Sequence, residues 1–321
     1  MVSTLPPLLP LLILIAVAII FIAGYFWLKR ARHRLTISAA LDADELDFDR
    51  RLGPLQFLER SEGKIAYRQI GQGPDLVCLH GIGASMIIYR RLVPLLADRY
   101  RVTCLDFPGF GWSDKPHSLS YELEPQADAL TAAIHMLDLK KPLVVASSMG
   151  AAIALASLTQ EAWARAIIAL APATDPGRIP KVFLPIAAHG ERLQRLPLST
   201  RATVRAVTHK VIARREIITP GLIDAYFRPF KAEPSAAAAF LKSFRLLGDR
   251  RMPALFKTLT IPLVILYGKN DGMVRAASCE KLEATVPGAK LIVHPTAGHH
   301  IMEDEPEWTA EQIAAVDASL A

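Results

Sequence analysis

The sequence predicts an α/β protein with a mostly parallel central sheet, helices on both faces, a helical insert and a preceding transmembrane helix. Short apolar runs alternate with longer helical stretches from residue 76 onward. Runs that are apolar throughout are typical of parallel strands buried on both faces. This rhythm breaks between residues 173 and 251, and 21 uncharged residues stand near the start of the chain. The 321 residues, 51% of them hydrophobic, suffice for one large core plus an appendage.

The uncharged run extends from Leu8 to Leu28 and is rich in Leu, Ile, Val and Phe. As a helix it would measure roughly 31 Å, close to the thickness of the hydrocarbon core of a bilayer. A cleaved signal peptide is the alternative, but it would carry positive charge before the run, and the first basic residue here is Lys29. We therefore expect residues 1–28 to be a single-pass membrane anchor. Four basic residues follow within 29–34, so the positive-inside rule places the N-terminus outside and the remainder of the chain in the cytoplasm.

Residues 29–53 are expected to be a juxtamembrane linker, and Gly53-Pro54 marks the entry to the globular core, residues 54–172 and 252–321. Two runs that flank Glu62-Gly63 predict an antiparallel strand pair over 55–59 and 64–70. Six later apolar runs predict the remaining strands, over 76–79, 102–105, 143–145, 166–170, 263–266 and 291–293.

Residues 173–251 are expected to form a helical cap. This range holds 15 Lys/Arg and 6 Asp/Glu, a net charge of +9 in a chain of net charge +6. Such a surface suits anionic lipid headgroups, at about 1 kcal/mol per well-placed cation. An ordinary solvated helix surface is the alternative. No nucleic-acid-binding module accompanies the charge, so we expect no nucleic-acid partner, and no obligate protein partner is evident.

The three cysteines are Cys78, Cys104 and Cys279, and their spacing is not that of metal ligands. Two of them fall in predicted strands, which indicates buried thiols in a reducing compartment. The glycines of His80-Gly81-Ile82-Gly83 lack the spacing of a dinucleotide-binding loop. The sequence therefore predicts neither a metal nor a cofactor.

The pentapeptide Ala146-Ser147-Ser148-Met149-Gly150 lies between a strand-like run and an alanine-rich helical stretch. A serine at a tight strand-to-helix turn, with small residues two positions away on each side, is typical of a nucleophile elbow. Ser148 meets this pattern, whereas Ser147 would place Met149 where a small side chain is needed. The first small residue is Ala146 instead of the usual glycine. A serine that merely caps a buried helix is the alternative.

Several segments line up in the order of the predicted strands: His80–Gly83, Asp106–Asp114, the Ser148 pentapeptide, Tyr267–Asp271 and Gly298-His299. Together they resemble the α/β-hydrolase family from about Leu55 to the C-terminus, most weakly across the insert. The order of an N-terminal helix and a hydrolase domain is similar to that of membrane-bound monoacylglycerol lipases.

The resemblance implies that Ser148 is the nucleophile, His299 the general base and Asp271 the acid that orients it. A serine hydroxyl must lose its proton as it attacks, and a histidine near its ordinary pKa can take that proton and pass it to the leaving group. A carboxylate fixes the imidazole tautomer and stabilises the imidazolium. The resemblance also implies that the backbone N–H groups of Ile82 and Met149 form the oxyanion hole.

Each assignment has a rival. His300 adjoins His299, but the Pro-Glu of the family pattern follows His299 by seven residues, and His294 falls in a strand. Asp175 is an alternative acid after the strand 166–170, in a turn where Asp is common. His80 and Asp106 are expected to support loops instead of reacting.

A serine at position 148 implies an acyl-enzyme, whereas an aspartate there would imply an epoxide hydrolase or a haloalkane dehalogenase. We expect a membrane-anchored serine hydrolase of lipid-like carboxylic esters. The cap would act as a lid, and five of its residues are expected to give it an apolar lining: Phe183, Leu184, Phe227, Phe230 and Phe240. A small soluble ester, a carbon–carbon bond substrate, or an inactive membrane-tethered interaction module are the alternatives.

Overall fold

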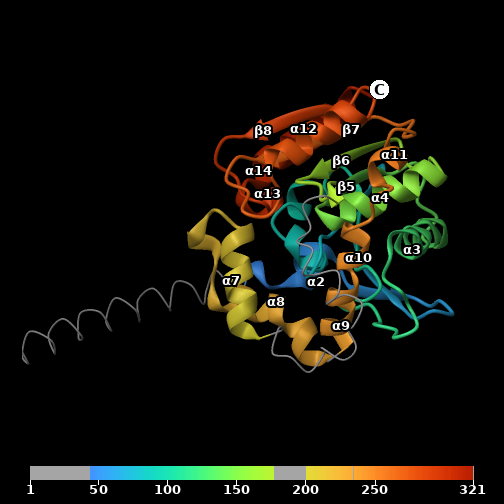
Figure 1. Ribbon diagram of the computed structural model, residues 1–321. Helices are drawn as coiled ribbons and strands as arrows, with labels where there is room; N and C mark the ends of the chain where they lie inside the picture. Colours follow the sequence, from blue (N-terminus) through green and yellow to red (C-terminus); the bar gives the residue numbers. More distant parts are fainter. Residues whose placement is uncertain (1–43, 177–199, 234, 321) are drawn as a thin grey trace, which may run out of the picture. The chain divides into compact units, whose positions relative to one another are not determined.

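An eight-stranded sheet of order β1-β2-β4-β3-β5-β6-β7-β8 lies at the centre of the unit Glu45–Ala321 (Figure 1). The computed structural model describes residues 44–176, 200–233 and 235–320. The strands are β1 (Leu55–Leu58), β2 (Ile65–Ile70), β3 (Asp75–Leu79), β4 (Arg101–Leu105), β5 (Leu143–Ser147), β6 (Ala166–Leu170), β7 (Leu263–Gly268) and β8 (Lys290–His294).

The sheet is mostly parallel. β2 pairs with β1 and with β4 in antiparallel fashion, and every other neighbouring pair is parallel. The predicted antiparallel pair is β1–β2, and all six predicted apolar strands are present with slightly different ends. The carboxyl ends of the parallel strands therefore meet along one edge of the sheet, where ligands bind in open α/β folds.

Helices complete the layers on both sides of the sheet. The described helices of the core are α2 (Phe48–Leu52), α3 (Leu123–Met136), α4 (Met149–Gln160), α11 (Met252–Phe256), α12 (Ala276–Thr285), α13 (Ile301–Asp304) and α14 (Pro306–Ala318), with 3₁₀ turns η1 (Met86–Tyr89) and η2 (Val93–Leu95). Those between β6 and β7 are α7 (Arg201–Val211), η4 (Arg215–Ile217), α8 (Pro220–Ala232), α9 (Ser235–Lys242) and α10 (Phe244–Leu247).

The apolar strands divide their side chains between two cores. In β5, Val144 and Ala146 face a core that includes residues of α3, α4, α11 and α12. Leu143 and Val145 face the other core, which includes residues of η1, η2, α13 and α14. All four of these side chains are fully buried. This double burial is the reason that each strand is apolar at every position and not at alternate ones.

The helices α7–α10 lie within the range predicted as the cap, at the left and lower side of Figure 1 in yellow and orange. Two of them begin at threonine caps: Thr200 accepts a hydrogen bond from Thr203 N, and Thr219 from Leu222 N, each at 3.1 Å. Such caps satisfy backbone N–H groups that have no partner within the helix. Residues 177–199 of the predicted cap lie outside the described residues.

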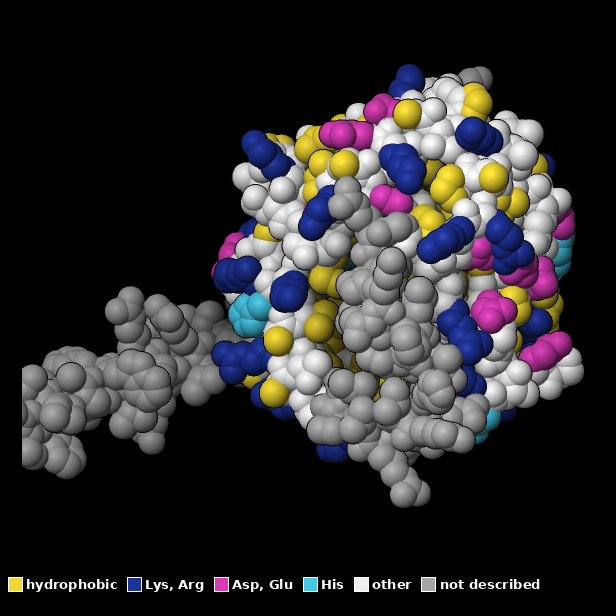
Figure 2. Space-filling view, in the orientation of Figure 1, with side chains coloured by type: hydrophobic (Ala, Val, Ile, Leu, Met, Phe, Trp, Pro, Cys, Tyr) yellow, Lys and Arg dark blue, Asp and Glu magenta, His cyan; other side chains and the backbone are white. Residues whose placement is uncertain are grey.

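Basic residues on the described part of the cap have acidic residues beside them (Figure 2). Four of its arginines form ion pairs. Arg201 pairs with Asp224 and Arg214 with Glu216 inside the cap, and Arg245 and Arg251 pair with Glu122 and Glu124 of the core, respectively. The net positive charge predicted from the sequence is thus partly offset by acidic neighbours, some of them outside the insert.

No helix in the described ranges is long and apolar enough to span a bilayer. The predicted anchor, residues 1–28, lies outside those ranges. Of the predicted linker 29–53, the final residues form α2, whose Leu52 is fully buried against the core.

Candidate active site

Ser148 occupies a strained turn between β5 and α4. Its backbone has φ 52° and ψ −116°, in the left-handed half of conformational space that non-glycine residues rarely adopt. The turn is fixed on both sides, because Ser148 N donates to Leu170 O at 2.9 Å and Ser148 O accepts from Ala173 N at 3.1 Å. Ser148 thus has the backbone geometry expected of a nucleophile elbow.

Neighbouring glycines let the chain approach this turn closely. A Cβ on Gly150 would lie 2.4 Å from the carbonyl oxygen of His80, and a Cβ on Gly81 would lie 2.9 Å from Cβ of Ser148. Neither site tolerates a side chain without movement of the backbone. Ala146, in place of the usual glycine, is fully buried in β5.

Ser147, the alternative nucleophile, is the last residue of β5. It is fully buried, and its Oγ has no hydrogen-bond partner within the described part of the chain. Ser148 keeps 6% of its surface exposed, so it is the better placed of the two serines to meet a substrate.

Asp271 and His299 come together from the loops after β7 and β8. Asp271 Oδ2 lies 2.8 Å from His299 Nδ1, and both side chains are buried. The other oxygen of Asp271 accepts from Met273 N at 2.6 Å and from Val274 N at 2.9 Å. The carboxylate is therefore fixed by its own loop and requires the proton of His299 on Nδ1, which leaves Nε2 as the proton acceptor.

These two loops cross at a pair of glycines. A Cβ on Gly268 would lie 2.3 Å from the carbonyl oxygen of Gly298. Asn270 N donates to Ala297 O at 2.9 Å, which ties the loop of the acid to the loop of the base. No hydrogen bond joins Ser148 Oγ to His299 among the described residues. Catalytic hydrogen bonds are often long without substrate and shorten in the Michaelis complex.

Two backbone N–H groups stand next to the serine without partners. Neither Ile82 N nor Met149 N has a hydrogen-bond partner in the part of the chain that the structure describes. Met149 is the first residue of α4, whose N-terminal dipole favours negative charge. Ile82 follows Gly81, which contacts Ser148. The pair has the chemistry of an oxyanion hole.

His80 holds the loop that carries Ile82. Its Nδ1–H donates to Gly81 O at 2.7 Å, and its Nε2 accepts from Phe107 N at 3.0 Å. Burial lowers the pKa of His80 to about 4, which keeps the ring neutral in these two roles.

Asp106 holds the next loop. It accepts hydrogen bonds from Met86 N at 2.6 Å and Trp112 N at 2.8 Å. Burial raises its pKa to about 7 in spite of these donors. Both residues support loops, as the sequence predicts.

The remaining rivals lie elsewhere. Asp175 is 3.1 Å from Lys281 of α12. His294 accepts from Ala297 N at 3.1 Å and packs edge-on against Trp308. Within the described residues, no group of three or more His, Cys, Asp or Glu side chains is arranged to hold a metal ion.

A cavity of about 110 Å³ lies between the cap and the oxyanion loop. Ile82 and Gly83 form one side, and a Cβ on Gly83 would lie 3.0 Å from the ring of Phe240. The apolar residues of the cap that line it are Val204, Val207, Val211, Phe230 and Phe240. Of the residues predicted to line the cap, Phe230 and Phe240 are in this wall, Phe227 is not, and Phe183 and Leu184 lie outside the described residues.

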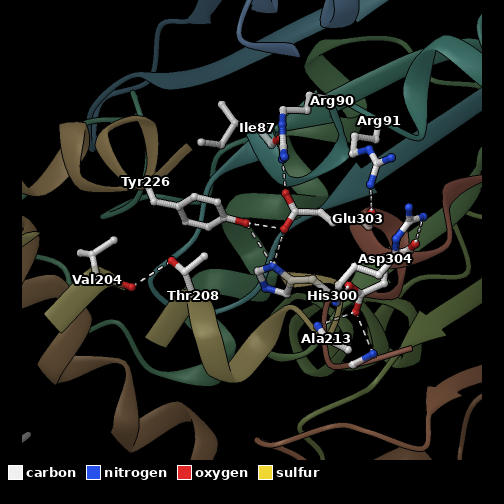
Figure 3. Close-up of polar contacts among 12 residues, drawn as sticks. Ile87, Arg90, Arg91, Val204, Thr208, Ala213, Tyr226, His300, Glu303 and Asp304 are labelled. Carbon is white, nitrogen blue, oxygen red and sulfur yellow. Dashed lines mark hydrogen bonds and ion pairs between the residues drawn. The ribbon is translucent and has the colours of Figure 1, made fainter. Parts of the chain in front are cut away.

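His300, whose ring stacks on that of His299, belongs to a buried polar network that the sequence did not predict; Figure 3 shows this network. Glu303 forms an ion pair with Arg90, and both side chains have no exposed surface. Glu303 Oε2 also lies 3.0 Å from His300 Nδ1 and accepts the hydroxyl of Tyr226, a cap residue, at 2.8 Å. Burial would raise the pKa of Glu303, but the Arg90 guanidinium, helped by His300 and Tyr226, lowers it to about 2.

A second carboxylate fastens the cap to the same loop. Asp304 accepts from Gly298 N at 2.7 Å, from Ala213 N at 3.0 Å and from Arg214 N at 2.9 Å. The loop that carries His299 is thereby bonded to the end of the first described cap helix. The repeated acidic residues after His299 were the only local signal of this role.

Known proteins resemble this chain over most of its length. The chain is 26% identical over 260 residues to the uncharacterized hydrolase YugF of Bacillus subtilis. This match covers 79% of this chain and 94% of YugF. It is also 27% identical over 295 residues to haloalkane dehalogenase 2 of Mycobacterium tuberculosis, a match that covers 84% of this chain and 98% of that protein. An alpha/beta hydrolase fold protein from Burkholderia ambifaria matches with a TM-score of 0.72 at 25% identity, covering 82% of this chain and 97% of that one.

The profile of the alpha/beta hydrolase family matches residues 76–312, a range that contains the Ser148 turn, the Asp271–His299 pair and the cap. The order of the strands and the position of Ser148, Asp271 and His299 in loops after the parallel strands agree with this match. The chain belongs to the alpha/beta hydrolase family.

Proposed function

We propose that this protein is a serine hydrolase that cleaves a carboxylic ester with an apolar arm. The observation that carries the proposal is Ser148, held at φ 52° between two unpartnered N–H groups. A serine at this position supports an acyl-enzyme mechanism, whereas the resemblance gives dehalogenases an aspartate there. Because the chain is 27% identical to haloalkane dehalogenase 2, dehalogenation is a competing reaction, and the serine at position 148 argues against it.

In the proposed reaction, Ser148 Oγ attacks the ester carbonyl carbon while His299 Nε2 takes its proton. The carbonyl oxygen becomes an oxyanion that the N–H groups of Ile82 and Met149 stabilise. His299 then gives the proton to the leaving alcohol, and the acyl group stays on Ser148 until water, deprotonated by His299, releases it. Asp271 keeps the ring of His299 in the required tautomer throughout.

The largely apolar cavity supports a substrate ester that carries an apolar chain. Its wall of valines and phenylalanines offers no charge to a polar acid, but it suits an alkyl chain. A lipid-like ester is the substrate class that also agrees with the predicted membrane anchor.

Covalent labelling with a fluorophosphonate tests the nucleophile. Wild-type protein should be labelled and Ser148→Ala should not, with hydrolysis of 4-nitrophenyl octanoate reduced by a factor on the order of 10⁶. Ser147→Ala is the matched control and should remain labelled and active. Equal labelling of wild type and Ser148→Ala would refute the assignment, and no labelling of either protein would favour the inactive interaction module.

Membrane attachment through residues 1–28 is part of the proposal. The apolar length of this run and the basic residues after it support a single-pass anchor with the hydrolase in the cytoplasm. Removal of residues 1–28 should release the protein from the membrane fraction while leaving hydrolysis of soluble esters unchanged. Retention on vesicles that contain anionic lipid would instead point to the basic residues of the cap.

A further inference from the structure

His300 is the histidine in a cavity wall that is otherwise made of apolar side chains and three hydroxyl-bearing residues, Thr203, Thr208 and Tyr226. It lines the cavity together with the valines and phenylalanines of the cap, and it is 5% exposed. Its ring is packed between Tyr226 and His299, with ring centroids 6.1 Å and 5.7 Å away. The position of the ring is therefore restricted by these two neighbouring rings.

One ring nitrogen of His300 is already used. Nδ1 lies 3.0 Å from Glu303 Oε2 and 3.1 Å from the hydroxyl oxygen of Tyr226, which itself donates to Glu303 Oε2. The ion pair with Arg90 keeps Glu303 ionised, and an ionised carboxylate only accepts hydrogen bonds. Nδ1 must therefore carry the proton that it donates, and in the neutral ring Nε2 becomes an acceptor.

The second nitrogen, Nε2, points away from Glu303 and Tyr226 (Figure 3). No hydrogen bond to it exists within the described part of the chain. Three hydroxyl groups of the cavity wall already have partners. Thr208 donates to Val204 O at 2.9 Å, Tyr226 donates to Glu303 at 2.8 Å, and Thr203 Oγ1 lies 2.9 Å from Thr200 Oγ1. An acceptor left without a donor in an apolar wall costs free energy, which a ligand that supplies a donor recovers.

We propose that His300 is a specificity-determining residue that accepts, through Nε2, a hydrogen bond from a hydroxyl group of the ester substrate. This inference rests on the proposed function. The same cavity reaches Ile82 and Gly83 of the oxyanion loop, and the ring of His299 is 5.7 Å from that of His300. The hydroxyl therefore lies within a few bonds of the ester, on either its alcohol side or its acyl side.

Matched esters distinguish the two sides. Glycerol 1-octanoate carries its hydroxyls on the alcohol, propyl 8-hydroxyoctanoate carries one on the acyl chain, and propyl octanoate carries none. Wild type should prefer one hydroxylated ester over propyl octanoate by about 10-fold in kcat/KM, the effect of one hydrogen bond to a buried acceptor. The ester that is preferred identifies the side.

His300→Phe keeps a ring between its neighbours and removes both nitrogens, so the kcat/KM ratio should fall to about 1. His300→Gln can donate its amide N–H to Glu303 and present its oxygen to the cavity, so it should recover part of the preference. His135→Phe, which replaces an exposed histidine of α3, is the matched control and should leave the ratio unchanged. Thermal melting and fluorophosphonate labelling of Ser148 establish that each variant is folded.

Failure of the role of His300 can be distinguished from failure of the proposed function. If wild type cleaves propyl octanoate but shows no preference for either hydroxylated ester, or if His300→Phe keeps the preference, the role of His300 is refuted and the serine hydrolase stands. If wild type cleaves none of the three esters and Ser148 is not labelled, the proposed function fails and the inference fails with it.

Discussion

His299 and His300 are neighbours in the chain, and Nδ1 of each faces a buried carboxylate, but the two carboxylates are held differently. Asp271, 2.8 Å from His299, is fixed by backbone N–H groups of its own loop. Glu303, 3.0 Å from His300, is fixed by the side chains of Arg90 and the cap residue Tyr226. The first pair belongs to the core alone, whereas the second joins the core to the cap. The same pair of functional groups can therefore serve proton transfer or packing, according to what surrounds it.

The largest expected effect is on the first pair. Asp271→Asn replaces the acceptor of the His299 proton with a group that can impose the wrong tautomer, so kcat should fall by about 10⁴-fold with little change in stability. Steady-state hydrolysis of 4-nitrophenyl octanoate measures this. Asp175→Asn, the alternative acid, should keep wild-type activity, and the opposite pattern would transfer the role to Asp175.

A substitution of Glu303, the carboxylate of the second pair, should first lower the stability of the protein. Glu303→Gln removes the buried counter-charge of the fully buried Arg90 guanidinium and leaves it with the partly exposed Glu45, 3.4 Å away, so the free energy of unfolding should fall by about 3 kcal/mol. Urea denaturation measures this loss. The double variant Arg90→Met, Glu303→Gln removes both charges and should recover much of the stability. A loss in the double variant as large as in the single one would show that the ion pair is not the cause.

The pH dependence of stability sharpens the comparison. The pKa of Glu303 is about 2 in the folded protein against a reference value of 4.5. Because the folded pKa is the lower one, this stabilisation is complete above about pH 4.5 and is lost as the pH falls toward 2, by about 3 kcal/mol. Denaturation curves of wild type and Glu303→Gln between pH 5 and 2 should therefore converge. Parallel curves would refute this linkage.

Much of the fold and of the site could be predicted from the sequence because the signals are local. Doubly buried strands must be apolar throughout, and the tight turn at Ser148 needs small neighbours such as Gly150. The order β2-β4-β3 could not be predicted in this way, because pairing depends on contacts between distant strands. The spacing to Pro306-Glu307 favours His299 over His300 as the base, a choice that stays a prediction, and nothing local in the sequence indicates the partners of His300.

The ion pair of Arg90 and Glu303 escaped prediction for the same reason. The two residues are 213 positions apart in the chain, and each alone looks like an ordinary surface charge. Tyr226 lies in the insert, where the resemblance to the family is weakest. Side chains that interact over such separations leave no periodic pattern that a single sequence displays.

That separation also bears on how the protein is made. A ribosome produces Glu303 213 residues after Arg90. Until then the Arg90 guanidinium lacks its buried counter-ion and can pair with the partly exposed Glu45, and neither His299 nor the cap has its final attachment. A nascent chain that stops short of Glu303 thus lacks part of the candidate site, so we expect hydrolytic activity to begin only after Glu303 has been made.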